Sequence, residues 1–194
     1  MCIRDSYNKG TQNGLIKHYT TITEEAKVPA ILYNVPSRTG CSLAASTVAY
    51  LAKNAEYVTA IKEASGDISH VADIMYACDG AIDLYSGNDD QIVPILSLGG
   101  KGVISVLSNV APKETHDIVA LFLEGKIKES RELQLKALPL VHALFSEVNP
   151  IPVKAALNLM GKEVGPLRLP LTEMEAAHQE VLVEEMKKFG IKLA

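Results

Sequence analysis

The stretch that decides the fold of this 194-residue chain is residues 31–64, ILYNVPSRTGCSLAASTVAYLAKNAEYVTAIKEA. It predicts a strand, a loop, a helix and a second strand. Tyr33 stands near the end of the first strand and Lys62 near the end of the second. In parallel α/β folds the loops that follow the strands converge over one edge of the sheet, where active sites form. We therefore expect Tyr33 and Lys62 to lie together at a candidate active site.

The chemistry of this pair follows from the position of the lysine. Lys62 comes directly after the apolar run YVTAI (residues 57–61), so its amine is partly desolvated. Desolvation penalises the ammonium form, lowers its pKa and frees the amine to attack a carbonyl carbon. A tyrosine within reach can carry protons to and from the adduct. The pair favours a Schiff-base enzyme, against the alternative of a solvated lysine beside a packing tyrosine.

The same strand–helix unit recurs along the chain. Apolar strands begin near Ile31, Val58, Ile82 and Val103, and amphipathic helices span about residues 44–53, 68–78 and 90–98. The strands are apolar on both faces, which is typical of a parallel sheet covered by helices. An earlier helix is predicted from its cap at Thr11 to about Lys27, with Leu15, Ile16, Tyr19, Ile22 and Ala26 on one face. The fold class is therefore α/β, with four parallel strands joined by right-handed connections.

Helices follow the last strand. They are predicted from Pro112 to Gly125, over residues 127–146 with a bend at Pro139, from Pro150 and Pro152 to Gly161, and from a capping box of Thr172 and Glu175 to Gly190. A barrel needs only one helix after its last strand. We therefore expect residues 1–125 to form a partial barrel and residues 126–194 to form a separate helical region.

Several longer motifs occur in a specific order: YNVPSRTG (33–40), AIKEASGD (60–67), LYSGNDD (84–90), LGGKGVISV (98–106) and NPIPVKAAL (149–157). Together they resemble the pyruvate-dependent aldolases of the dihydrodipicolinate synthase family, over nearly the whole chain from Tyr7 onward. The resemblance implies a (β/α)₈ TIM barrel with a C-terminal helical appendage. Four strands are half of such a barrel, so the chain looks like its C-terminal half plus the appendage. The first three strand–helix units and the fourth strand would be missing, and the chain alone would be inactive.

The resemblance also implies roles for individual residues. Lys62 would form an imine with pyruvate, which a primary amine can do without a cofactor. Tyr33 would donate and accept protons, in a relay with a threonine of the missing half and with Tyr7, which reaches in from a neighbouring subunit in the family. The family usually has two adjacent aromatic residues at this last position, whereas here Ser6 precedes Tyr7.

Three further positions match the substrate-binding motifs of the family. Arg38 would hold the carboxylate of the second substrate, because a guanidinium forms two parallel hydrogen bonds with a carboxylate. Ile104 would offer backbone groups near pyruvate, and Gly87 would let the chain approach the substrate closely. Glu63 points to the other side of the strand from Lys62, so we expect a structural role for it.

The function implied is the condensation of pyruvate with L-aspartate-4-semialdehyde to 4-hydroxy-tetrahydrodipicolinate, in lysine biosynthesis, by a lyase that acts as a homo-oligomer (dimer or tetramer). The alternatives are an N-acetylneuraminate lyase or 2-keto-3-deoxy-sugar-acid aldolase of the same fold, a doubly wound binding domain, and a non-catalytic fragment. The sister aldolases do not normally carry an arginine in the SRTG context, so Arg38 favours the synthase.

Composition excludes several other classes. The net charge of −4 provides no basic surface for nucleic acid, and no apolar run reaches the length of a membrane span. The three cysteines are widely spaced, and the first residues lack the apolar core of a signal peptide, so we expect a cytoplasmic protein. The five histidines show no metal-binding spacing, and we expect neither a metal nor a cofactor.

Overall fold

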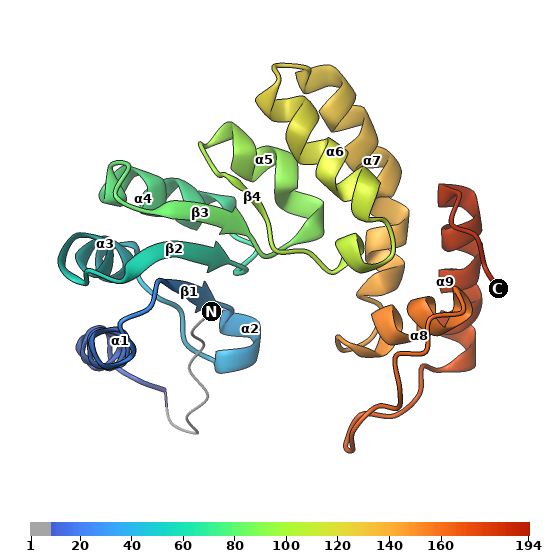
Figure 1. Ribbon diagram of the computed structural model, residues 1–194, viewed down its shortest axis with the longest axis horizontal. Helices are drawn as coiled ribbons and strands as arrows, with labels where there is room; N and C mark the ends of the chain where they lie inside the picture. Colours follow the sequence, from blue (N-terminus) through green and yellow to red (C-terminus); the bar gives the residue numbers. More distant parts are fainter. Residues whose placement is uncertain (1–8) are drawn as a thin grey trace. The chain divides into compact units, whose positions relative to one another are not determined.

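The computed structural model describes residues 9–194 (Figure 1). By its internal contacts the chain divides into two compact units, residues 1–104 and 105–194. In the described residues, all the strands belong to the first unit, and the second unit contains helices only. No described helix has both the length and the apolar character that crossing a lipid bilayer requires.

The first unit is built on a sheet, which in the described residues has four strands in the order β1-β2-β3-β4. The strands are β1 (Ala30–Asn34), β2 (Val58–Glu63), β3 (Asp83–Ser86) and β4 (Gly102–Val103). Every neighbouring pair is parallel, and the order in the sheet follows the order in the chain. The predicted α/β class and the predicted strand positions are confirmed.

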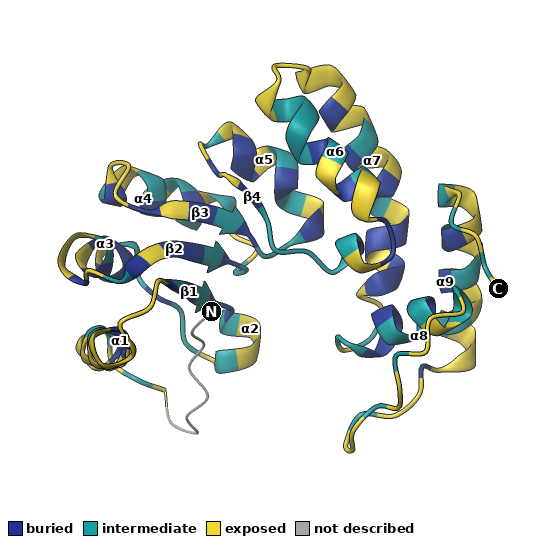
Figure 2. Ribbon diagram, in the orientation of Figure 1, coloured by how far each residue is buried: buried dark blue, intermediate teal, exposed yellow. Residues whose placement is uncertain are grey.

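Helices cover one face of this sheet: α1 (Gln12–Ala26), α3 (Ala45–Asn54), α4 (Ile68–Cys78) and α5 (Ile92–Ser97). Their apolar side chains and those of the strands form one core, in which Leu32, Ile61 and Leu84 are fully buried (Figure 2). The alternate strand positions are less protected, since Tyr33, Lys62 and Tyr85 are only half-buried. The sheet therefore has one face packed under helices and one face that offers side chains for chemistry.

Local capping explains where two of these helices begin. The Thr11 hydroxyl accepts a hydrogen bond from the Gly14 N–H at 3.1 Å and starts α1. The Asp67 carboxylate accepts from the N–H groups of Ser69 and His70 at 2.9 and 3.2 Å, so α4 starts soon after β2 ends.

The structure corrects the predicted face of α1. Its buried residues are Leu15, Tyr19 and Thr23, whereas Ile22 and Ala26 are not among them. Thr23 can be buried because its hydroxyl donates to the Tyr19 carbonyl at 2.8 Å. The polar atom is thus satisfied inside the helix.

The helix predicted from residue 90 also begins later. A 3₁₀ turn, η1 (Asp89–Gln91), comes first, and α5 begins at Ile92. Proline has no N–H, so Pro94 cannot donate to a carbonyl one turn earlier. A helix that begins at Ile92 places Pro94 in its first turn, where no such bond is needed.

The second unit contains η2 (Leu107–Asn109), α6 (Pro112–Leu123), α7 (Ile127–Leu144), α8 (Ile151–Leu159) and α9 (Ala176–Phe189). It has its own apolar core, to which Leu107, Leu140, Leu144 and Leu182 contribute fully buried side chains. Helices close to all four predicted positions are therefore confirmed, including α7, which contains Pro139.

The predicted capping box of α9 is wrong. Glu175 occupies the N-cap position, but its side chain makes no cap hydrogen bond. The Glu175 N–H instead donates to the Glu147 carboxylate at 2.9 Å, and the His178 imidazole lies 2.9 Å from the same oxygen. Both partners lower the pKa of Glu147, the histidine more than the backbone N–H. A carboxylate from a distant segment thus performs the capping that Thr172 was expected to perform.

The predicted boundary between residues 125 and 126 is placed after the last strand and the one helix that a barrel needs after it. It therefore assigns α6 to the barrel. The division by internal contacts assigns α6 to the later helices instead. These are different criteria, so the division by strand–helix units stays a prediction.

Candidate active site

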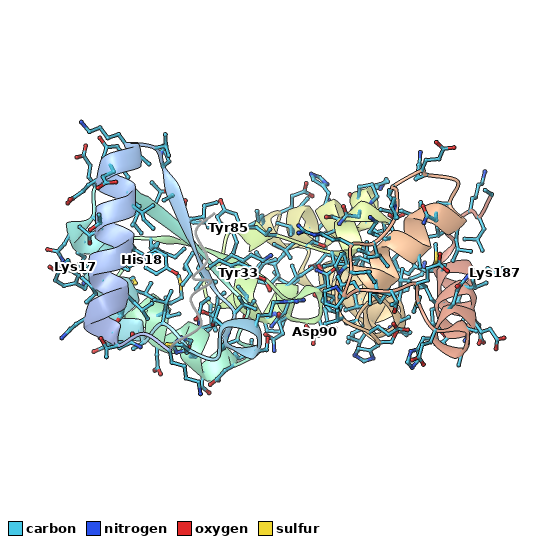
Figure 3. All side chains as sticks on the ribbon, turned by 90° about the horizontal axis from the view of Figure 1, so that it is seen from below. Lys17, His18, Tyr33, Tyr85, Asp90 and Lys187 are labelled. Atoms are coloured by element: carbon cyan, nitrogen blue, oxygen red, sulfur yellow. The ribbon has the colours of Figure 1, made fainter. Side chains whose placement is uncertain are left out.

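Tyr33 and Lys62 meet at the carboxyl ends of β1 and β2. They are direct partners in the register of the two strands, and the Lys62 Nζ lies 4.4 Å from the centroid of the Tyr33 ring. On the other side of Lys62 its partner in the register is Tyr85 of β3. Figure 3 labels both tyrosines. The structure thus brings together the two residues that the sequence singled out, in one row across the sheet.

The surroundings of this row shift the pKa values of Lys62 and Tyr33. Burial is the main reason that the pKa of Lys62 lies below that of an ordinary lysine; the Asp89 carboxylate opposes the shift, and the Arg38 guanidinium adds to it. Burial raises the pKa of the Tyr33 phenol, and Arg38 partly offsets the rise. At a given pH, Lys62 is therefore more often a free amine than an exposed lysine is, and Tyr33 is more firmly a neutral phenol.

Arg38 stands in a short helix that the sequence did not predict. This helix, α2 (Pro36–Thr39), begins with the proline that ends β1 and stops at Gly40, whose φ of 65° is in the left-handed region. The Arg38 side chain is exposed, and its charge influences both Tyr33 and Lys62. This arrangement leaves the guanidinium available to a ligand beside the pair.

Gly87 follows β3 and lies against the end of β2. A Cβ at this position would stand 2.5 Å from the Ala64 Cβ and 3.1 Å from the Lys62 Cε. The Gly87 N–H donates to the Glu63 carbonyl at 2.7 Å, which holds the two segments together. The structure thus shows a reason for a glycine here that the sequence did not reveal: the close approach of β2 and the lysine itself.

Ile104 and Tyr7 are the remaining two predicted site residues. The Ile104 N–H donates to the Ser86 carbonyl at 2.9 Å, so a ligand at Ile104 would have to use its carbonyl. Tyr7 lies outside the described residues.

The sequence analysis did not single out Asp89, although this residue lies close enough to act on Lys62. It is 1% exposed, and its charge acts on Lys62. The available signal was its position in LYSGNDD, two residues after Gly87, because a loop that follows a parallel strand lies at the same edge as Lys62.

Two other features bear on where a ligand could bind. Residues 9–194 contain no group of three or more His, Cys, Asp and Glu side chains arranged to hold a metal ion. A cavity of about 560 Å³ lies in the second unit, lined by residues of α8, by residues 165–167 and 171–174 and by Gln179 of α9, and it includes none of the predicted site residues. We assign it no role.

Comparison with known proteins shows what the whole chain is similar to. Residues 1–189 match the model of the dihydrodipicolinate synthetase family. A 4-hydroxy-tetrahydrodipicolinate synthase of Lachnoclostridium phytofermentans is 60% identical over 185 residues, which cover 95% of this chain and 63% of that relative.

Solved structures give the same result. The dihydrodipicolinate synthase of Thermotoga maritima has a TM-score of 0.92 at 44% identity, over 95% of this chain and 63% of that chain. The chloride-inhibited enzyme of Acinetobacter baumannii, solved in complex with pyruvate, has a TM-score of 0.91 at 40% identity, over 96% of this chain and 64% of that one. This chain thus spans just under two thirds of the length of these relatives, and its four described strands match part of their barrel. The chain belongs to the dihydrodipicolinate synthetase family.

Proposed function

We propose that this chain carries the Schiff-base half of a lyase that condenses pyruvate with L-aspartate-4-semialdehyde to 4-hydroxy-tetrahydrodipicolinate. The observation that supports this most directly is the placement of the Lys62 Nζ 4.4 Å from the centroid of the Tyr33 ring. The names of the relatives and the pyruvate complex of the Acinetobacter enzyme support the choice of substrates.

In the proposed reaction the free amine of Lys62 attacks the ketone carbon of pyruvate, and loss of water leaves an imine. The lowered pKa of Lys62 favours this step, because only the unprotonated amine has the electron pair that forms the bond. The protonated imine then acts as an electron sink, so the methyl group loses a proton. The resulting enamine attacks the aldehyde carbon of the second substrate. The amino group of that substrate then attacks the imine carbon, which closes the ring and releases Lys62 as a free amine.

Tyr33 supplies and removes the protons in this scheme. Its raised pKa keeps it a neutral phenol, which can protonate the leaving hydroxyl of the carbinolamine and take the proton back later. Tyr7 would join the relay from a second subunit of a homo-oligomer.

Arg38 would select the second substrate. Its exposed guanidinium beside the pair can form two charged hydrogen bonds with the carboxylate of aspartate semialdehyde. Gly87 would keep room beside Lys62 for the adduct, and the Ile104 carbonyl would face it. This assignment favours the synthase over the sister aldolases, whose substrates are sugar acids.

We further infer that residues 1–125 correspond to the C-terminal half of the family's barrel and residues 126–194 to its helical appendage, in a cytoplasmic enzyme. Tyr33 and Lys62 would then stand on the fifth and sixth strands of the full barrel.

Reduction with borohydride in the presence of pyruvate tests the proposal, in a version of this protein extended to the full length of its relatives. The expected result is a covalent, reduced pyruvate adduct on Lys62, located by peptide mass spectrometry and absent from a Lys62→Arg variant. Lys101 and Lys154 serve as internal controls in the same digest, because both lie in family motifs outside this row. An adduct on either of these lysines, with none on Lys62, would overturn the assignment.

A further inference from the structure

Directly behind the Tyr33–Lys62 pair, on the helix-covered face of the sheet, lies a second pair of polar residues. Asn34 and Glu63 are also direct partners in the register of β1 and β2, one residue further along each strand. Because side chains alternate along a strand, this pair points away from the face that carries Lys62. Each residue is only 1% exposed.

The carboxylate of Glu63 is held by donors from two segments. Its Oε2 accepts from the Asn34 Nδ2 at 2.8 Å, and its Oε1 accepts from the Ser65 N–H at 2.7 Å. The His70 Nε2, from the first turn of α4, lies 4.0 Å from Oε2, which is too long for a hydrogen bond. Both carboxyl oxygens are therefore used as acceptors, which is what a carboxylate can offer and a neutral amide cannot.

Asn34 extends the same network. Its side-chain Oδ1 accepts from the Leu43 N–H at 2.9 Å, while its Nδ2 also lies 3.2 Å from the Ser42 Oγ. The pair thus ties the end of β1 to the end of β2, to the segment before α3 and to the segment before α4. A buried carboxylate is costly unless such partners satisfy it, so this network constrains the local geometry closely.

We propose that Asn34 and Glu63 act as positioning residues: their buried hydrogen bond sets the register and spacing of β1 and β2 and thereby holds the Lys62 amine over the Tyr33 ring. A slip of one residue would exchange the two faces, and a smaller shear would move Lys62 relative to Tyr33. The buried apolar face selects which side chains point inward, and the directional Asn34–Glu63 bond adds a constraint on the distance between the two strand ends.

The hydrogen-bond pattern allows a swap of partners as a test. In Glu63→Gln the new amide N–H₂ must face another donor, either the Asn34 Nδ2 or the Ser65 N–H. In Asn34→Asp two carboxylates face each other. In the double variant Asn34→Asp/Glu63→Gln the amide introduced at position 63 can donate to the carboxylate introduced at position 34, while the Leu43 and Ser65 N–H groups keep their acceptors. The double variant therefore keeps these three bonds and the net charge.

A matched control accounts for the loss of a carboxylate by itself. Glu56→Gln makes the same chemical change at an exposed position before β2, where no strand register depends on it. It should leave Lys62 as in wild type.

Two readouts report on Lys62. The first is the pH dependence of its acetylation by acetic anhydride, followed by mass spectrometry with exposed Lys17 as the internal reference. The second is the rate of reductive trapping with pyruvate, in the version of this protein that is extended to the full length of its relatives. We expect each single variant to move the acetylation midpoint of Lys62 toward that of an ordinary lysine by about one pH unit. Trapping should slow about tenfold to a hundredfold, as expected when a reacting group is misplaced. The double variant should return both readouts to within about twofold of wild type.

If Asn34 and Glu63 only stabilised the fold, their variants would change the melting temperature and not the two readouts of Lys62. Single variants that lower the melting temperature but leave the acetylation midpoint and the trapping rate of Lys62 as in wild type would overturn the inference. If a single variant does not fold, the double variant decides, because a folded double variant with an ordinary Lys62 midpoint also overturns it. The inference rests on the proposed function only for the trapping readout. Acetylation needs no substrate, so a wild type that forms no pyruvate adduct would defeat the function and leave the acetylation test intact.

Discussion

The two faces of the sheet at the ends of β1 and β2 carry polar pairs of opposite character. On the open face Tyr33 and Lys62 are half-buried, and the amine lies 4.4 Å from the ring centroid. On the helix-covered face Asn34 and Glu63 are almost completely buried, and a 2.8 Å hydrogen bond joins them. One register places both pairs.

The difference shows how burial acts on polar groups with and without partners. Glu63 receives hydrogen bonds at both oxygens, so its burial produces rigidity. Lys62 is desolvated in a region where one cation and one carboxylate act on it in opposite directions, and its pKa falls. Burial therefore holds Asn34 and Glu63, the rear pair, in place. In the front pair, Tyr33 and Lys62, burial makes the lysine amine more reactive.

The largest effect on the front pair should come from removing the phenol hydroxyl alone. Tyr33→Phe keeps the ring beneath Lys62 and deletes the hydroxyl that moves protons. We expect trapping with pyruvate to slow by about 100-fold or more, in the range for loss of general acid–base catalysis. Tyr85→Phe is the matched control, since Tyr85 is the partner of Lys62 on the other strand. Equal losses in both variants would show that Tyr33 acts through packing.

Arg38→Ala tests the exposed side of the front face. Loss of a bidentate contact with a carboxylate, worth about 1.5–3 kcal/mol, should raise the KM for aspartate semialdehyde by about 10- to 100-fold. Imine formation with pyruvate should change little, because burial is the main cause of the low Lys62 pKa. Steady-state kinetics for each substrate, in a version of this protein extended to the full length of its relatives, measure this, with Arg131→Ala, exposed in α7, as control. Equal damage to the parameters of both substrates would assign Arg38 a structural role.

Gly87→Ala should disturb the contact between the end of β2 and the loop after β3. The new methyl group would stand 2.5 Å from the Ala64 Cβ, so the loop or the strand must move. We expect a loss of about 1–3 kcal/mol in stability, as for other overpacked sites, and slower trapping at Lys62. Thermal unfolding and trapping measure the two effects.

A second substitution serves as the control for this prediction. Ala64→Gly removes the methyl group that the new one meets, so the double variant Ala64→Gly/Gly87→Ala should recover most of the lost stability. A double variant as unstable as Gly87→Ala alone would contradict the steric explanation.

The smallest expected effect is electrostatic. The Asp89 carboxylate favours the ammonium form of Lys62, so its removal in Asp89→Asn should lower the pKa of Lys62 further. The acetylation midpoint should therefore move to lower pH, by less than about one unit. Asp90→Asn, the exposed neighbour labelled in Figure 3, is the control. A midpoint that rises in Asp89→Asn would reverse the sign of this interaction and refute the prediction.

The sequence predicted the strands and most helices because their signals are local. Apolar runs between turn residues marked β1 to β3, and Thr11 marked the start of α1. Some errors had local causes, such as Pro94 in the first turn of α5, and one occurred where a distant group replaced a local one. Glu147 holds the start of α9 in place of Thr172, although it comes from a segment before α8.

By itself the sequence determined the α/β class, the family and the pairing of Tyr33 with Lys62 at the strand ends, since alternation and motif order are properties of the linear chain. Only the tertiary structure showed that one face of the sheet carries the buried, hydrogen-bonded pair and the other carries the half-buried Tyr33 and Lys62. The close approach of Gly87 to Ala64, the charge of Asp89 near Lys62 and the buried bond between Asn34 and Glu63 each join segments far apart in sequence. Such contacts depend on the relative position of two strands in space, and no periodicity within either strand encodes that position.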